Sequence, residues 1–156
     1  MRKQLIEYEP TTPLPDHGTW LDLEAVAEVE ISSEDPGQPI EGALLPGGTG
    51  WRAGSPGTQY IRLLFAQPQV LRRISLRFVE TAVSRTQEFL LRWSADGGST
   101  YRELVRQQWN FSPDGSTVEN ENLQVELDAV TQIELSVTPD IANPQAVASL
   151  AEWRLA

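Results

Sequence analysis

Apolar and polar residues alternate along several short stretches of this chain. Residues 60–65 place Ile61, Leu63 and Phe65 at every second position. Successive side chains of a β-strand point to opposite faces, so this alternation predicts strands with one buried and one exposed face. The other stretches with the same period are 28–31, 73–78, 88–93, 123–127, 133–137 and 151–155.

Turn-forming residues separate these stretches, at 67–68, 95–98, 112–115 and 139–140. Strands at this spacing, joined by such turns, predict an all-β sandwich of two antiparallel sheets. A short helix is expected around Leu21–Val26. Residues 1–24 are rich in turn formers and predict an N-terminal arm that packs on a single domain of residues 25–156.

Tryptophans are expected mainly in the core of this sandwich. Trp93 and Trp153 fall at inward positions of predicted strands. Trp20 is expected to hold the arm against the domain.

Composition narrows the classes of partner. The chain has 156 residues, the usual size of one domain, and no cysteine, which excludes disulfides and thiol nucleophiles. Its formal net charge of −10 disfavours nucleic acid, because phosphate backbones require clustered cations. Arg72, Arg73 and Arg77 are interpreted as a solvated strand face, with contact to a single phosphate or carboxylate as the alternative.

The N-terminal residues lack the apolar run of a signal peptide, because Glu7 and Glu9 interrupt it. No stretch of the sequence is typical of a membrane span. These observations favour a cytoplasmic location and disfavour a membrane partner.

Seven segments follow one another in a recognisable order, among them a loop that ends in a tryptophan at 49–53 and a strand with its hairpin at 89–98. The full set is 32–35, 39–44, 49–53, 59–63, 68–78, 89–98 and 148–155. Together they resemble the discoidin or coagulation-factor type C family. The resemblance covers residues 27–156 and implies an eight-stranded antiparallel jelly-roll β-sandwich of the galactose-binding type, with a ligand site in the loops at one end. It extends to the N-terminal domain of a DNA single-strand-break repair scaffold, which works through protein partners, so fold does not fix function.

The same resemblance implies that Trp51 is core packing beside a metal loop, and Arg52 is expected to pair with a nearby carboxylate. It also implies a structural calcium, held by the loop before Trp51 and by a glutamate of the last strand. Glu152 stands at the position of that glutamate. Gly42 replaces the family's asparagine, and Leu45 or Pro46 replaces its aspartate. Calcium takes about six to eight oxygen ligands, and backbone carbonyls could supply most of them, so calcium stays an alternative.

Two segments carry the candidate ligand-binding residues. In residues 106–117, Trp109 could stack on a sugar while Asn110 and Arg106 bind its hydroxyl groups. The alternative is that Trp109 plugs the end of the sandwich. Arg85 and Gln87, in the predicted loop 80–87, would share this pocket if both segments emerge at the same end.

Nothing in the sequence indicates an enzyme. His17 is the only histidine and lies in the predicted arm, and glutamates such as Glu28, Glu126 and Glu134 alternate with apolar residues, which predicts solvent faces. We therefore expect a non-catalytic module that recognises carbohydrate through its end loops. The alternative is an intracellular protein–protein interaction domain of the same fold.

Overall fold

The computed structural model describes residues 20–156, so residues 1–19 of the predicted arm, including His17, lie outside the described part. In chain order the elements are α1 (Leu23–Val26), β1 (Ala27–Ile31), α2 (Glu41–Leu44), β2 (Trp51–Arg52), β3 (Gln59–Val79), β4 (Arg85–Ser94), β5 (Arg102–Phe111), β6 (Val118–Thr138), β7 (Ser149–Leu150) and β8 (Glu152–Leu155). None of the helices between residues 20 and 156 is long and apolar enough to cross a membrane.

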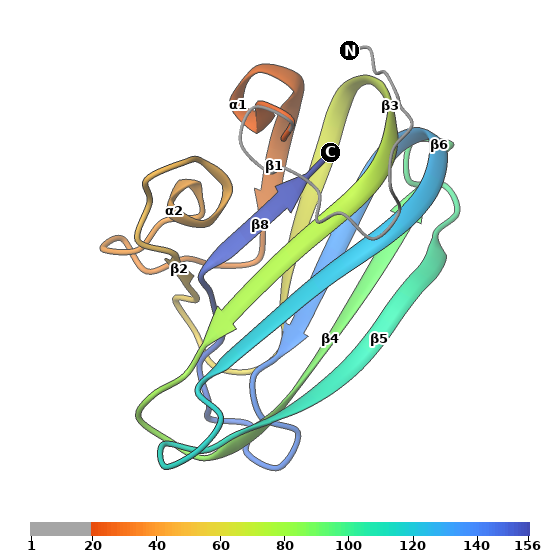
Figure 1. Ribbon diagram of the computed structural model, residues 1–156. Helices are drawn as coiled ribbons and strands as arrows, with labels where there is room; N and C mark the ends of the chain where they lie inside the picture. The colour runs from red at the N-terminus through yellow and green to blue at the C-terminus, as the bar shows by residue number, and fades with distance from the viewer. Residues whose placement is uncertain (1–19) are drawn as a thin grey trace, which may run out of the picture.

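The strands form two layers that pack face to face (Figure 1). The larger layer has the order β1–β3–β6–β4–β5 and uses the first half of β3 and the second half of β6. The smaller layer places the second half of β3 between β8 and the first half of β6. All these pairings are antiparallel, and β2 pairs separately with β7. The predicted eight-stranded jelly-roll sandwich is confirmed.

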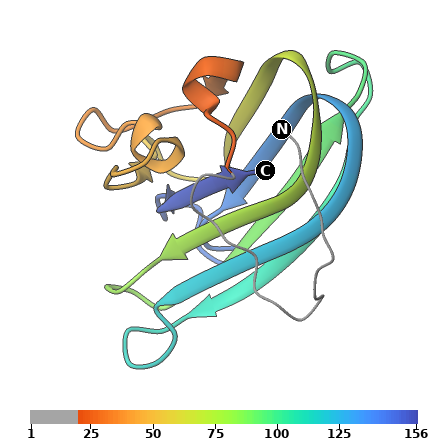
Figure 2. The same cartoon turned by 45° about the horizontal axis from the view of Figure 1, so that its top comes forward.

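β3 and β6 each run through both layers, curving over at the same end of the molecule (Figure 2). Their ladder breaks register between Leu64 and Arg73, and Ala129 takes a positive φ of 56° on the β6 side. The expected turn at Gln67-Pro68 is therefore wrong, because the strand continues through it. Proline lacks an amide hydrogen and is tolerated where the ladder is interrupted.

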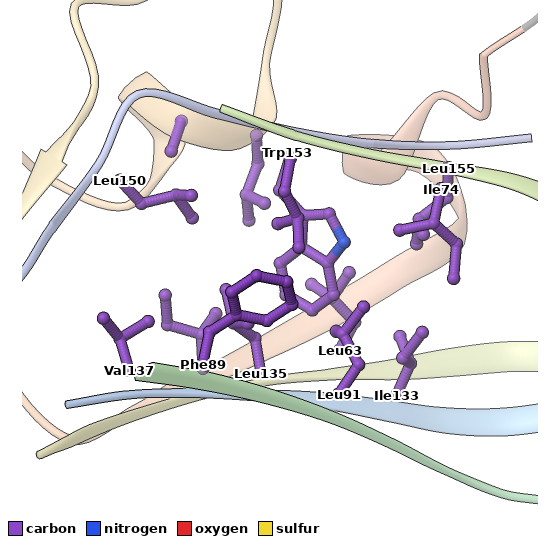
Figure 3. Close-up of a cluster of buried hydrophobic side chains, with 14 of the residues drawn as sticks. Leu63, Ile74, Phe89, Leu91, Ile133, Leu135, Val137, Leu150, Trp153 and Leu155 are labelled. Atoms are coloured by element: carbon purple, nitrogen blue, oxygen red, sulfur yellow. The ribbon is translucent and has the colours of Figure 1, made fainter. Parts of the chain in front are cut away.

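The core lies between the two layers and is built from the inward residues of both (Figure 3). Trp51 and Trp153 are fully buried, as predicted. Trp93 is only partly buried but packs against the core. The rings of Phe78 and Phe89 stack across the layers with centroids 5.5 Å apart. Burial of this apolar surface is the main stabilising contribution to the fold.

The segment before β1 packs against the end of the sandwich. The predicted short helix is confirmed as α1, which crosses the expected boundary between residues 24 and 25, and Leu23 belongs to the buried core. The amide of Leu21 donates to the carbonyl of Leu155 at 2.7 Å. Arg73 lies 4.1 Å from the centre of the Trp20 ring, so a cation–π contact fixes this tryptophan to β3.

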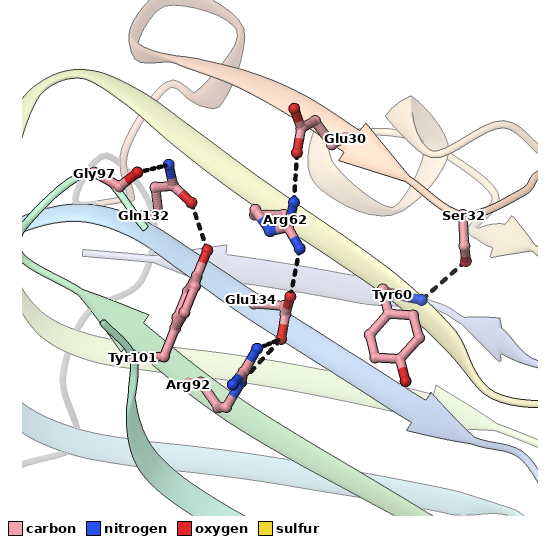
Figure 4. A network of polar contacts seen from close by, with 9 residues as sticks. All are labelled: Glu30, Ser32, Tyr60, Arg62, Arg92, Gly97, Tyr101, Gln132 and Glu134. Atoms are coloured by element: carbon pink, nitrogen blue, oxygen red, sulfur yellow. Dashed lines mark hydrogen bonds and ion pairs between the residues drawn. The ribbon is translucent and has the colours of Figure 1, made fainter. Parts of the chain in front are cut away.

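The outer face of the larger layer carries a chain of ion pairs (Figure 4). Arg62 on β3 joins Glu30 at 2.7 Å and Glu134 at 2.8 Å, and Arg92 on β4 joins Glu134 at 2.6 Å. The Glu134 side chain is only 4% exposed. The expectation that Glu134 lies on a solvent face is wrong in that respect. Glu134 does lie on the outer face of the larger layer. Its side chain is covered there by the two arginines and by Tyr101, which stacks on Arg92.

We predict that Glu134→Gln lowers the free energy of unfolding by about 2 kcal/mol, because two guanidinium groups lose their shared carboxylate while its site stays covered. Urea denaturation followed by tryptophan fluorescence measures this change. Glu30→Gln is the matched control, since Glu30 is 57% exposed and pairs with one of the same arginines. Its effect should stay within about 1 kcal/mol, and equal losses in both variants would contradict the prediction.

Candidate functional site

One end of the sandwich gathers the loops 53–58, 80–84, 112–117 and 139–148, which we call the loop end (Figure 1). Backbone hydrogen bonds tie these loops together. The amide of Glu80 donates to the carbonyl of Thr117 at 2.9 Å, Gly57 donates to Ala146 at 3.0 Å, and Ile141 donates to Thr86 at 2.9 Å. The loop end is therefore one connected surface.

Arg85 joins two of these loops from inside. It is the first residue of β4 rather than a loop residue, and its side chain is 4% exposed. Its Nη1 donates to the carbonyl of Val147 at 3.0 Å and lies 3.3 Å from the Glu80 carboxylate. Burial lowers the pKa of the Arg85 guanidinium, and the Glu80 charge opposes that shift. Its Nε and Nη2 find no acceptor among residues 20–156.

Trp109 lies on β5, near the end of the strand, rather than in one of the end loops. The indole is partly buried, packs against the core, and donates from Nε1 to the Ser116 hydroxyl at 3.1 Å. Gln107 is exposed on the same face of the strand. We call Trp109, Gln107 and Ser116 the Trp109 surface. Here an aromatic ring held in a fixed orientation lies beside groups able to form hydrogen bonds.

The strand alternation separates the predicted ligand residues. Gln87 is the cross-strand partner of Trp109, and Arg85 is the partner of Phe111, so both share the inner face and the end of the sandwich with Trp109. Asn110 and Arg106 lie on the outer face instead. Asn110 accepts a hydrogen bond from Thr86 at 2.6 Å, and Arg106 pairs with Glu88 and Glu103. A single pocket that includes all five residues is therefore not formed.

Glu119 is a buried acid beneath this surface. It extends from the smaller layer, is fully buried, and accepts a hydrogen bond from Gln87 Nε2 at 3.2 Å, so the pair bridges the two sheets. Burial and the neighbouring carboxyl of Glu121 raise the pKa of Glu119 to about 8, against the opposing effect of Gln87. At neutral pH the carboxyl is mostly protonated, which suits an interior position.

The sequence analysis did not consider Glu119 and Glu121 as site residues. The signal was present, because the apolar alternation of Leu123, Val125 and Leu127 continues backwards onto these two glutamates. Glu121 shares the face of β6 with Glu119 and is turned toward the larger layer, which carries Trp109. An acidic residue that takes an inward position in an alternating strand thus indicates a buried carboxyl group.

The residues at the implied calcium position do not fit a calcium ion. A side chain at Gly42 is excluded, because its Cβ would lie 2.6 Å from the carbonyl oxygen of Gly50. Glu152 is 42% exposed and forms an ion pair with Arg154 at 3.0 Å. Residues 20–156 contain no group of three or more acidic, histidine or cysteine side chains arranged to hold a metal.

Arg52 was expected to pair with a nearby carboxylate. It is exposed, and no carboxylate partner is found for it in the described part of the chain.

Comparison with known proteins gives matches only to solved structures, since no family model and no curated protein matches the chain. The family 32 carbohydrate-binding module of Clostridium perfringens NanJ, in complex with galactose, matches with a TM-score of 0.63 and 13% identity over 87% of this chain and 96% of that one. The chain has the galactose-binding-like jelly-roll fold.

Two further structures with this jelly roll are similar to the chain. CpGH89CBM32-5 from Clostridium perfringens, in complex with GalNAc-β-1,3-galactose, matches with a TM-score of 0.64 and 17% identity over 88% of this chain and 99% of that one. The CBM32 of AlyQ, in complex with 4,5-unsaturated mannuronic acid, matches with a TM-score of 0.58 and 18% identity over 84% and 95%. The jelly-roll resemblance drawn from the sequence is thereby confirmed at the level of fold.

The raised pKa of Glu119 predicts a pH-dependent stability. The folded protein holds this proton up to a pH of about 8, whereas the unfolded chain releases it near the ordinary value of 4.5. The folded state therefore binds more protons between these values, and the contribution of Glu119 to stability falls as the pH rises through this window. In Glu119→Gln this contribution is absent, so the variant should gain stability relative to the parent as the pH rises.

Urea unfolding of both proteins at about pH 5 and about pH 8.5 measures this difference. Glu126→Gln is the matched control, because Glu126 is an exposed glutamate on the same strand. A stability difference between Glu119→Gln and the parent that is the same at both pH values would show that Glu119 does not retain its proton.

Proposed function

We propose that this chain is a non-catalytic carbohydrate-binding module that takes a glycan against the Trp109 surface at the loop end. The observation that carries the proposal is the position of Trp109 on the inner face of edge strand β5. Its ring is only partly covered, while its N–H is fixed by Ser116. A ring held in this way can stack on the C–H face of a sugar with little further loss of side-chain freedom.

The polar groups around the ring suit sugar hydroxyls. Gln107 offers both a donor and an acceptor, Ser116 offers a hydroxyl, and Glu121 is an acceptor on the facing sheet. The chain carries a net charge of −10, which disfavours a heavily carboxylated or sulfated polymer. We therefore infer a preference for uncharged glycans.

Arg85 and Gln87 support this surface from below. Arg85 connects the loops that follow β3 and β6, and Gln87 connects the strand beside Trp109 to Glu119 on the opposite sheet. Such contacts hold a ligand site in place without touching the ligand. The structural neighbours add independent support, because the NanJ module is in complex with galactose and CpGH89CBM32-5 is in complex with GalNAc-β-1,3-galactose, and both ligands are uncharged.

We predict that the purified protein binds neutral glycans on an array and that Trp109→Ala lowers the affinity for the best of them by about tenfold or more, because the stacking platform is lost. Titration calorimetry measures the change. Gln107→Ala, at an exposed position that leaves the core intact, should weaken binding by a smaller factor.

Tyr60→Ala is the matched aromatic control. Tyr60 is 48% exposed but lies on the outer face of the larger layer, so its loss should leave affinity unchanged. Circular dichroism and thermal melts establish that each variant is folded. Binding that survives Trp109→Ala and disappears with Tyr60→Ala would move the site to the outer face, and a blank array would shift the proposal to a protein partner.

A further inference from the structure

The segment from α2 to β2, residues 41–50, folds back tightly on itself. The amide of Gly50 donates to the carbonyl of Gly42 at 2.9 Å. A Cβ at Gly48 would lie 2.2 Å from the carbonyl oxygen of Gly42, so only glycine is compatible with this approach. The turn leaves the carbonyl oxygens of Ala43 and Leu45 directed at β8, where they need donors.

Arg154 on β8 supplies those donors. Its Nη1 donates to the carbonyl of Ala43 at 2.9 Å and to that of Trp153 at 3.2 Å. Its Nη2 donates to the carbonyl of Leu45 at 3.2 Å and pairs with Glu152 Oε2 at 3.0 Å. One guanidinium thus meets three carbonyl oxygens and one carboxylate oxygen. The side chain is 12% exposed, so these contacts are largely shielded from water.

Backbone carbonyls together with a carboxylate are the ligand set that a hard cation such as calcium prefers. A fixed guanidinium among them repels a second cation and has already engaged the oxygens. We propose that Arg154 is a built-in cation that replaces calcium in this chain and holds the 41–50 segment against β8 without any metal. This inference is independent of the glycan proposal, since it concerns residues outside the Trp109 surface.

Arg72 shows a different arrangement, with a 54% exposed side chain and a single ion pair with Asp128 at 3.5 Å. The 41–50 segment also leads directly into β2, whose Trp51 is fully buried and donates from its indole to the carbonyl of Ser33 at 3.1 Å. Release of the 41–50 segment would therefore weaken the packing of β2 and of Trp51 in the core.

The first experiment measures the melting temperature of the unaltered protein in EDTA and in millimolar calcium. The two values should agree. A rise in melting temperature with calcium would overturn the proposal, and this arm requires no variant. Arg154→Met, which keeps the aliphatic length but removes the charge and the donors, should lower the melting temperature by about 5 °C or more in both buffers.

A second measurement separates this role from general destabilisation. Hydrogen exchange at the Leu45 and Gly50 amides should become faster in Arg154→Met, while amides at the centre of β6, such as Leu135, stay protected. Arg154→Lys, which keeps a positive charge with fewer directed donors, should fall between the parent and Arg154→Met. Arg72→Met should match the parent. Unchanged exchange at Leu45 and Gly50, or a lysine variant as unstable as the methionine variant, would overturn the proposal.

Discussion

The antiparallel pairing of β3 with β6 is the constraint on which the rest of the structure depends. Each strand is 21 residues long, and the register shifts between Leu64 and Arg73 carry the pair from one layer into the other. The two sheets therefore share these two strands and are not held together by packing alone. In the larger layer β1 pairs with β3, β4 pairs with β6 and β5 pairs with β4, and in the smaller layer β8 pairs with β3, while β2 and β7 form a separate pair. The loop end lies where both halves of the ladder finish (Figure 1).

This geometry explains why polar groups are buried beneath the loop end. The strands finish there, and their last inward positions are Arg85 and Gln87 on β4 and Glu119 on β6. Gln87 and Glu119 bridge the layers, and Arg85 joins two loops. Apolar residues at these positions would pack as well, but they would not link particular loops in a particular orientation, which is what a ligand surface requires.

Arginine side chains fix the relative positions of several strands and loops of this protein. Arg62 and Arg92 enclose Glu134 on the outer face, Arg85 joins the loops, and Arg154 satisfies the carbonyls of the 41–50 segment. The sequence has one lysine, Lys3, beside its arginines. A planar guanidinium presents several donors in fixed directions, so it can satisfy two or three oxygens at once where an ammonium group acts as a point charge. In an acidic chain without cysteine, these contacts tie together strands and loops that lie far apart in the sequence.

The sequence by itself determined the two-sheet sandwich, because the alternation of apolar and polar residues is a local property of each strand and does not depend on how the strands pair. It also indicated Trp51 and Trp153 as core residues, whereas a common end for Trp109, Arg85 and Gln87 was only a condition that the sequence could not decide. It could not decide that residues 67–68 continue a strand, since a bulge depends on the partner strand. Only the tertiary structure covered Glu134 with two arginines and brought Arg154 to Ala43. These outcomes rest on contacts between residues far apart in the chain, which no local pattern encodes.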